Sequence, residues 1–155
     1  MLRIIKDPLP WYRAAHWMER KKIPLVPWLI TYWIRFFYAA FLPPTVEIGA
    51  GTKLGYGGLG VVIHQNAKIG RDCLISQQVT IGGTGTRVGV PTIGDGVHIG
   101  AGAKILGPIS IGDGAVVGAN AVVVTDVSPH AVVGGIPARI LHQRGQGLEK
   151  DNGRQ

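Results

Sequence analysis

The sequence predicts a mainly β protein, a parallel β-helix of stacked six-residue repeats that follows a short helical segment. An aliphatic residue recurs at this spacing, at Ile63, Ile69, Ile75, Ile81, Ile93, Ile99, Ile105, Ile111, Val117 and Val123. Glycine directly follows six of these residues. A six-residue period is not that of a helix. It fits one short strand and one turn, with the aliphatic side chain inward and glycine at the corner. A single unit buries too little surface alone, so the units must stack.

The length and the cysteine content are those of one small domain in a reducing compartment. The chain has 155 residues, of which 46% are hydrophobic, so a core is easily built. Its single cysteine, Cys73, occupies a small inward position of the repeat and is expected in the core. One cysteine excludes an intramolecular disulfide. No N-terminal stretch has the order of segments that a signal peptide needs, so we expect a cytoplasmic protein.

The positive charge is concentrated near the N-terminus. Of the net charge of +7, residues 1–45 contribute +5, from seven basic and two acidic side chains, whereas residues 46–140 contribute +1. Proteins that bind nucleic acid usually carry their basic residues over the main folded face, so we predict no nucleic-acid partner. Here the excess lies beside a very aromatic segment, which favours a membrane surface or another anionic partner.

Residues 1–44 are predicted to hold two helices. Residues 8–22 form the first, in which Pro10 suits a first-turn position. Residues 27–42 form the second, which Pro43–Pro44 ends. We expect Thr31, Arg35 and Tyr38 on its polar face, and Ile30, Trp33, Ile34, Phe37 and Phe41 on the other side.

Three interpretations of residues 25–42 stay open. The segment packs against the end of the β-helix or a neighbouring subunit, lies in the plane of a membrane surface, or spans a bilayer. Its 18 residues are just long enough to span. Arg35 in its middle opposes a span by about 3 kcal/mol. The basic flank and the tryptophan and tyrosine content favour peripheral contact at the inner face of the membrane.

The repeat domain, residues 45–141, has two irregularities. Three extra residues enter at YGGLG, residues 56–60. Residues 84–92 are predicted to form a loop outside the stack, because continuing the six-residue phase would bury the charge of Arg87. Loops on a rigid scaffold commonly carry function. Residues 142–155 form a polar tail, expected to be flexible.

The runs VVIHQNAKIG, IGGTG, HIGAGAKILG and GGIPAR identify a family resemblance within residues 46–141. Together they resemble the serine acetyltransferase branch of the hexapeptide-repeat acyltransferases. The resemblance implies a left-handed β-helix and transfer of an acetyl group from acetyl-CoA to a hydroxyl. It also implies a homotrimer or a dimer of trimers, with sites at the subunit junctions.

The same resemblance implies which residues bind the co-substrate acetyl-CoA. Gly82, Gly83 and Thr84 would let the backbone approach the pantetheine arm, and Ala103 and Lys104 match the wall of the CoA site. Lys104 and Arg139 are the expected partners of the CoA phosphates.

Two departures from the family pattern concern the catalytic base. Gly55 and Tyr56 stand where serine acetyltransferases have an Asp-His pair, and Val90–Pro91 stands where they have His-Pro. The usual base and part of the site for the serine carboxylate are therefore missing. This leaves serine as the acceptor in question.

Three residues are candidates for the missing base. His64 lies 18 residues, one full coil, before Gly82, and is therefore expected directly beneath the GGTG motif. Tyr56 would position the acceptor or relay its proton, and His98 is a further candidate at another corner. The remaining histidines, and the aspartates of the two IGDG turns, are expected to be structural or exposed: His16, His130, Asp95 and Asp113.

The sequence thus favours an acetyl-CoA-dependent O-acetyltransferase acting on a hydroxyl of serine or of a sugar, including a lipid-linked one, in cell-surface polysaccharide synthesis. The alternative is a catalytically inactive scaffold or a membrane-surface assembly protein, because the Asp-His pair is missing. A carbonic anhydrase on this scaffold would need three zinc-binding histidines with a close pair. His64, His98 and His130 lack that spacing, so no metal is predicted.

Overall fold

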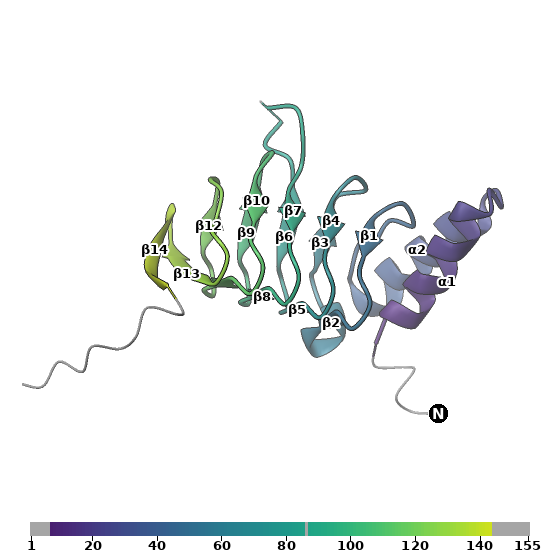
Figure 1. The fold of residues 1–155 in the computed structure, drawn as a ribbon. Helices are drawn as coiled ribbons and strands as arrows, with labels where there is room; N and C mark the ends of the chain where they lie inside the picture. The colour runs from purple at the N-terminus through teal and green to yellow at the C-terminus, as the bar shows by residue number, and fades with distance from the viewer. Residues whose placement is uncertain (1–6, 86, 144–155) are drawn as a thin grey trace, which may run out of the picture.

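The computed structural model describes residues 7–85 and 87–143. Two helices, α1 (Leu9–Arg20) and α2 (Val26–Tyr38), lie at one end of a β-helix whose coils follow one another along its axis (Figure 1). Both helices are shorter than predicted. Helix α2 ends four residues before residue 42 because Ala39 adopts a left-handed conformation, with φ of 51°. Phe41 then pairs with Val62 of the first coils in a parallel bridge.

Three sheets form the walls of the β-helix, and each coil contributes one short strand to each wall. The β1 sheet has the order β1-β4-β7-β10, the β2 sheet β14-β13-β11-β8-β5-β2, and the β3 sheet β12-β9-β6-β3. The strands are β1 (Glu47–Ile48), β2 (Lys53–Leu54), β3 (Val62–Ile63), β4 (Lys68–Ile69), β5 (Leu74–Ile75), β6 (Thr80–Gly82), β7 (Thr92–Ile93), β8 (His98–Ile99), β9 (Lys104–Leu106), β10 (Ser110–Ile111), β11 (Val116–Val117), β12 (Val122–Val123), β13 (Ala131–Gly135) and β14 (Ala138–Gln143).

The strand register confirms both irregularities of the repeat. Paired residues are 18 apart where the repeat is unbroken, as in Val62 with Thr80. They are 21 apart in Lys53 with Leu74, across the insertion, which forms a 3₁₀ turn over Gly55–Gly58. They are 24 apart in Thr80 with Lys104, across the second irregularity. There the chain leaves the stack as the loop that projects from the β-helix in Figure 1, and Arg87 is exposed on it, as predicted.

The core confirms the predicted inward positions. All ten aliphatic residues of the six-residue pattern are buried, and Cys73 is buried among them. Burial raises the pKa of the Cys73 thiol, which suits a core residue and not a nucleophile. At one corner, aspartates link successive coils: Asp95 accepts the Arg71 backbone N–H at 2.7 Å, and Asp113 accepts the Asp95 backbone N–H at 2.8 Å. Asp95 and Asp113 are therefore structural, as the turn pattern predicts.

The predicted faces of α2 were wrong. Its buried stripe is Pro27, Thr31 and Ile34. Thr31 can be buried because its hydroxyl bonds to the carbonyls of Pro27 and Leu42, at 3.2 and 3.3 Å. Trp33 and Phe37, expected on the inward side, are exposed. No helix in residues 7–85 and 87–143 is long and apolar enough to cross a membrane.

The two ends of the β-helix are closed in different ways. At the N-terminal end, Tyr12 of α1 is buried, and its hydroxyl donates a hydrogen bond to the Val46 carbonyl. At the other end, β13 and β14 form an antiparallel pair. Strand β14 reaches Gln143, so the repeat domain ends two residues later than the predicted boundary at 141. The rest of the predicted tail lies outside the described residues.

Candidate active site

A groove of about 320 Å³ lies where β3 and β6 run side by side. Pairing of Ile63 with Ile81, and the hydrogen bond from the His64 backbone N–H to the Ile81 carbonyl at 2.8 Å, bring His64 beside Gly82. The predicted stacking of one coil is thus confirmed. We call this the His64 groove; its lining residues are Phe41, Val62, Ile63, His64, Gln65, Thr80, Ile81 and Gly82.

The ring of His64 is half-buried and held by its own turn. Its Nδ1 accepts the backbone N–H of Asn66 at 3.1 Å. A neutral imidazole that accepts at Nδ1 carries its proton on Nε2, so the free edge of this ring is a hydrogen-bond donor. To take a proton from a substrate, the ring must release Asn66 and turn. In this conformation His64 is suited to stabilise negative charge, and it becomes a base only after that rotation.

The GGTG segment begins at the rim of the His64 groove. A side chain at Gly82 would meet nothing within 4 Å, so the space above its Cα is open. Gly83 and Thr84 are exposed as the chain leaves the stack. The Gly82 carbonyl accepts the Gly107 N–H at 2.9 Å, which ties the root of the loop to the next coil. A ligand can therefore approach this backbone closely, as pantetheine binding would require.

Lys104 lies one coil further along the same sheet, whereas Ala103 faces the core. Lys104 pairs with Thr80, and its ammonium group bonds to the Gln78 carbonyl at 2.7 Å. An ammonium group has three donors, so Lys104 keeps donors for an anion. The Ala103 side chain is fully buried, and its backbone groups bond to Thr80 and Gly100. The prediction that Ala103 forms the CoA wall is therefore wrong for its side chain, which supports Lys104 from behind.

Arg139 is not brought to Lys104 within one chain. It lies on β14, which extends the β2 sheet, whereas Lys104 lies in the β3 sheet on another wall. Its guanidinium is exposed and donates to the Ala138 carbonyl at 3.0 Å. A joint role of the two cations toward one CoA thus needs a second subunit.

The other two candidate bases lie away from the His64 groove. Tyr56 is 85% exposed and lines a separate groove of about 510 Å³ together with Phe36, Phe37 and Leu59. His98 is exposed on β8, between Leu74 and Val116 of the β2 sheet. Only His64 of the three adjoins Gly82.

Sequence reasoning missed part of the groove lining. Phe41 was assigned to the second helix, but it is the first residue to pair with the coils. Thr80 and Gln65 flank the repeat positions and were not considered. The signal was present, since residues before and after an inward position point outward by strand alternation.

The titratable residues of the described chain do not gather into a metal site. No group of three or more His, Cys, Asp or Glu side chains there could hold a metal ion. His16, for example, has its Nδ1 2.8 Å from the Pro44 carbonyl, a structural contact between α1 and the first coil.

Known proteins share this repeat and this fold. Residues 91–125 match the family model described as bacterial transferase hexapeptide (six repeats). The serine acetyltransferase of Synechococcus elongatus is 40% identical over 136 residues, which are 86% of this chain and 55% of that protein. Soybean serine acetyltransferase complexed with serine superimposes with a TM-score of 0.82 at 40% identity, covering 86% of this chain and 56% of that one. The Brucella abortus enzyme in complex with coenzyme A gives 0.84 at 32% identity, covering 88% and 55%.

The repeats, the coils and the matching family model define a hexapeptide-repeat β-helix protein. Within this class the chain is serine acetyltransferase-like in sequence and fold, which confirms the resemblance predicted from its motifs. The chain spans about half the length of these relatives.

Proposed function

We propose that the protein is an acetyl-CoA-dependent O-acetyltransferase that acts on a small acceptor hydroxyl. The observation that carries this proposal is the His64 groove, where an imidazole adjoins Gly82 at the root of the GGTG segment. Lys104 on the next coil supplies a cation to a CoA phosphate. Serine acetyltransferases that share 40% of the aligned residues include one complexed with serine, which supports the reaction class.

In this reaction the acceptor oxygen attacks the thioester carbonyl carbon, a C–O bond forms, and the C–S bond breaks. The proton of the hydroxyl must go to a base, and the CoA sulfur takes a proton as it leaves. Open backbone at Gly82 and Gly83 lets the thioester come close. His64 takes the hydroxyl proton if its ring turns, and in the observed conformation it donates its Nε2–H to the developing oxyanion instead.

The acceptor and the assembly follow from what this chain lacks. With Gly55–Tyr56 and Val90–Pro91 in place of the expected residues, a sugar hydroxyl of cell-surface polysaccharide synthesis is as suitable an acceptor as serine. We further propose a homotrimer whose sites lie between neighbouring β-helices. This assembly would let Arg139 and the exposed Tyr56 of one subunit reach the His64 groove of another.

The proposal is tested by calorimetry with acetyl-CoA and by thiol release with serine, nucleotide sugars and a lipid-linked sugar. We expect binding, and release with one acceptor. His64→Ala should lower turnover by about 10²- to 10⁴-fold. His98→Ala, an exposed histidine on another wall, is the matched control and should leave turnover unchanged. Absence of acetyl-CoA binding would overturn the transferase assignment.

A glutamine at position 64 separates the two roles of His64. Glutamine donates a hydrogen bond but does not take up a proton. If His64 acts as a donor, His64→Gln should retain well over the activity of His64→Ala. Equal loss in both variants, together with a rate that falls below the pH at which imidazole titrates, would assign His64 as the base.

The alternative is a catalytically inactive scaffold, and one observation favours it: the Nδ1 of His64 is occupied by its own turn. Acetyl-CoA binding without thiol release across the whole acceptor panel would support this alternative.

A further inference from the structure

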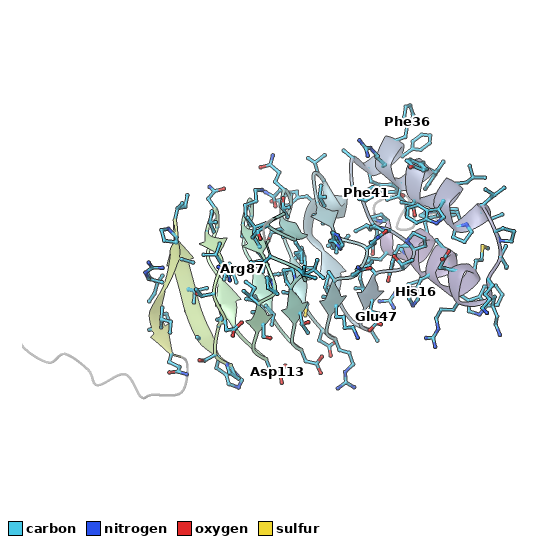
Figure 2. All side chains as sticks on the ribbon, turned by 90° about the horizontal axis from the view of Figure 1, so that it is seen from above. His16, Phe36, Phe41, Glu47, Arg87 and Asp113 are labelled. Carbon is cyan, nitrogen blue, oxygen red and sulfur yellow. The ribbon has the colours of Figure 1, made fainter. Side chains whose placement is uncertain are left out.

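Helix α2 has a second apolar face that the β-helix does not cover. Of its 13 residues, only Thr31 and Arg35 are neither apolar nor aromatic. One stripe packs inward, but Leu29 on the opposite side is 66% exposed and Phe36 is 82% exposed. Figure 2 shows Phe36 at the edge of the molecule, directed away from the coils. A helix that is apolar all round is normally buried all round, so this face needs a cover.

The exposed face continues onto the neighbouring elements. Trp11 of α1 packs against Trp33, with ring centroids 4.9 Å apart, and helps to line a groove of about 390 Å³ between the helices. At the other end, Tyr56 and Leu59 adjoin Phe36 and Phe37. We call the whole the aromatic surface; it consists of Trp11, Val26, Leu29, Trp33, Phe36, Phe37, Tyr56 and Leu59. Contiguous exposed apolar surface of this kind marks a contact with a protein or a membrane.

The charges around the aromatic surface choose between these occupants. Residues 7–44 carry five basic side chains, Arg13, Arg20, Lys21, Lys22 and Arg35, against two acidic ones, Asp7 and Glu19. The five basic side chains are exposed. Helix α2 has no acidic residue. A second copy docked through the same face would bring like charges together. Anionic lipid headgroups complement the cations, and the exposed Trp and Tyr rings suit the headgroup level.

We propose that the aromatic surface docks on an anionic membrane surface, with α2 in the membrane plane. Leu29 and Phe36 enter the acyl boundary, and the basic side chains contact lipid phosphates. This docking does not depend on the acetyl transfer proposed above and is measured without acetyl-CoA.

Flotation with vesicles tests the proposal on the full chain. The protein should float with phosphatidylcholine vesicles that contain phosphatidylglycerol, and less so without it or at high salt. Leu29→Ser/Phe36→Ser should weaken binding by about tenfold or more. Ile140→Ser/Leu141→Ser is the matched control, because these residues are 63% and 66% exposed at the far end of the β-helix. The control should bind as the wild type does.

Two outcomes overturn the proposal. The first is a wild-type chain that does not float with the anionic vesicles, particularly if Leu29→Ser/Phe36→Ser changes the oligomeric state in light scattering. The face would then be a subunit interface. The second is equal flotation of the wild type and this variant. Should the variant fail to fold, Arg20→Gln/Lys21→Gln/Lys22→Gln replaces it, since these side chains are exposed. Unchanged binding of that variant also overturns the proposal.

Discussion

At the scale of single residues, Asp95 makes the corner of the β-helix sensitive to acid. Its carboxylate accepts the Arg71 backbone N–H and pairs with the Arg71 guanidinium at 3.0 Å. These bonds, the backbone one first, hold the pKa of Asp95 below its ordinary value. A lowered pKa means that the folded state prefers the carboxylate. The stabilisation is therefore complete above about pH 4 and is lost as the pH falls through the folded pKa.

We expect Asp95→Asn to flatten the acid limb of the melting temperature measured by circular dichroism. The wild-type melting temperature should fall more steeply than that of the variant between about pH 5 and pH 2. Glu19→Gln on α1, which also removes one carboxylate, serves as the control and should keep the wild-type slope. Parallel curves for the wild type and Asp95→Asn would contradict the prediction.

Two glycines predict opposite effects of one methyl group. At Gly82 a Cβ meets nothing within 4 Å, so Gly82→Ala should change the free energy of unfolding by no more than about 0.5 kcal/mol. The methyl group would point into the space left for pantetheine and should weaken acetyl-CoA binding about tenfold. At Gly70 a Cβ would lie 2.5 Å from the Gly94 backbone, so Gly70→Ala should destabilise by about 1–3 kcal/mol. Calorimetry and urea unfolding measure both; normal acetyl-CoA binding by Gly82→Ala would count against the assigned site.

At the scale of elements, the loop between β6 and β7 separates function from fold. Thr80 and Lys104 are paired although they are 24 residues apart, six more than an unbroken coil needs. Removing residues 85–90 restores 18. Because the loop lies outside the stack, we expect the melting temperature to change by only a few degrees. Acetyl-CoA binding should be lost. A shortened chain that still binds acetyl-CoA would place the CoA site elsewhere.

The same elements show what the sequence could predict. The six-residue period predicted the coils, both irregularities and the meeting of His64 with Gly82, because register follows from counting residues along a regular stack. It did not predict which stripe of α2 faces inward, since a helix with apolar residues all round carries no periodic signal. Nor could it predict that Tyr56 and Arg139 lie away from His64, because different walls of the coil meet only through an assembly.

At the scale of the whole molecule, α1 and α2 act as the cap of the stack. A solenoid needs an end that covers its last apolar layer. Here Leu9, Tyr12 and Ile34 are buried over the first coil, beside Leu42 and Val46. Burial raises the pKa of Tyr12 to about 12, in keeping with a phenol enclosed between α1 and that coil.

A chain that begins at residue 45 should therefore be aggregation-prone and should melt well below the full chain. Each of the three large side chains contributes about 1.5–3 kcal/mol by burial, so their loss removes about 5–9 kcal/mol. That is comparable with the whole stability of a small domain. A chain that ends at residue 143 is the matched truncation, because the predicted polar tail contributes no repeat, and it should melt as the full chain does. Circular dichroism and light scattering measure both. A cooperative, monodisperse transition of the N-terminally shortened chain at the full-length temperature would show that the first coil needs no cap and that α1 and α2 serve only the membrane contact.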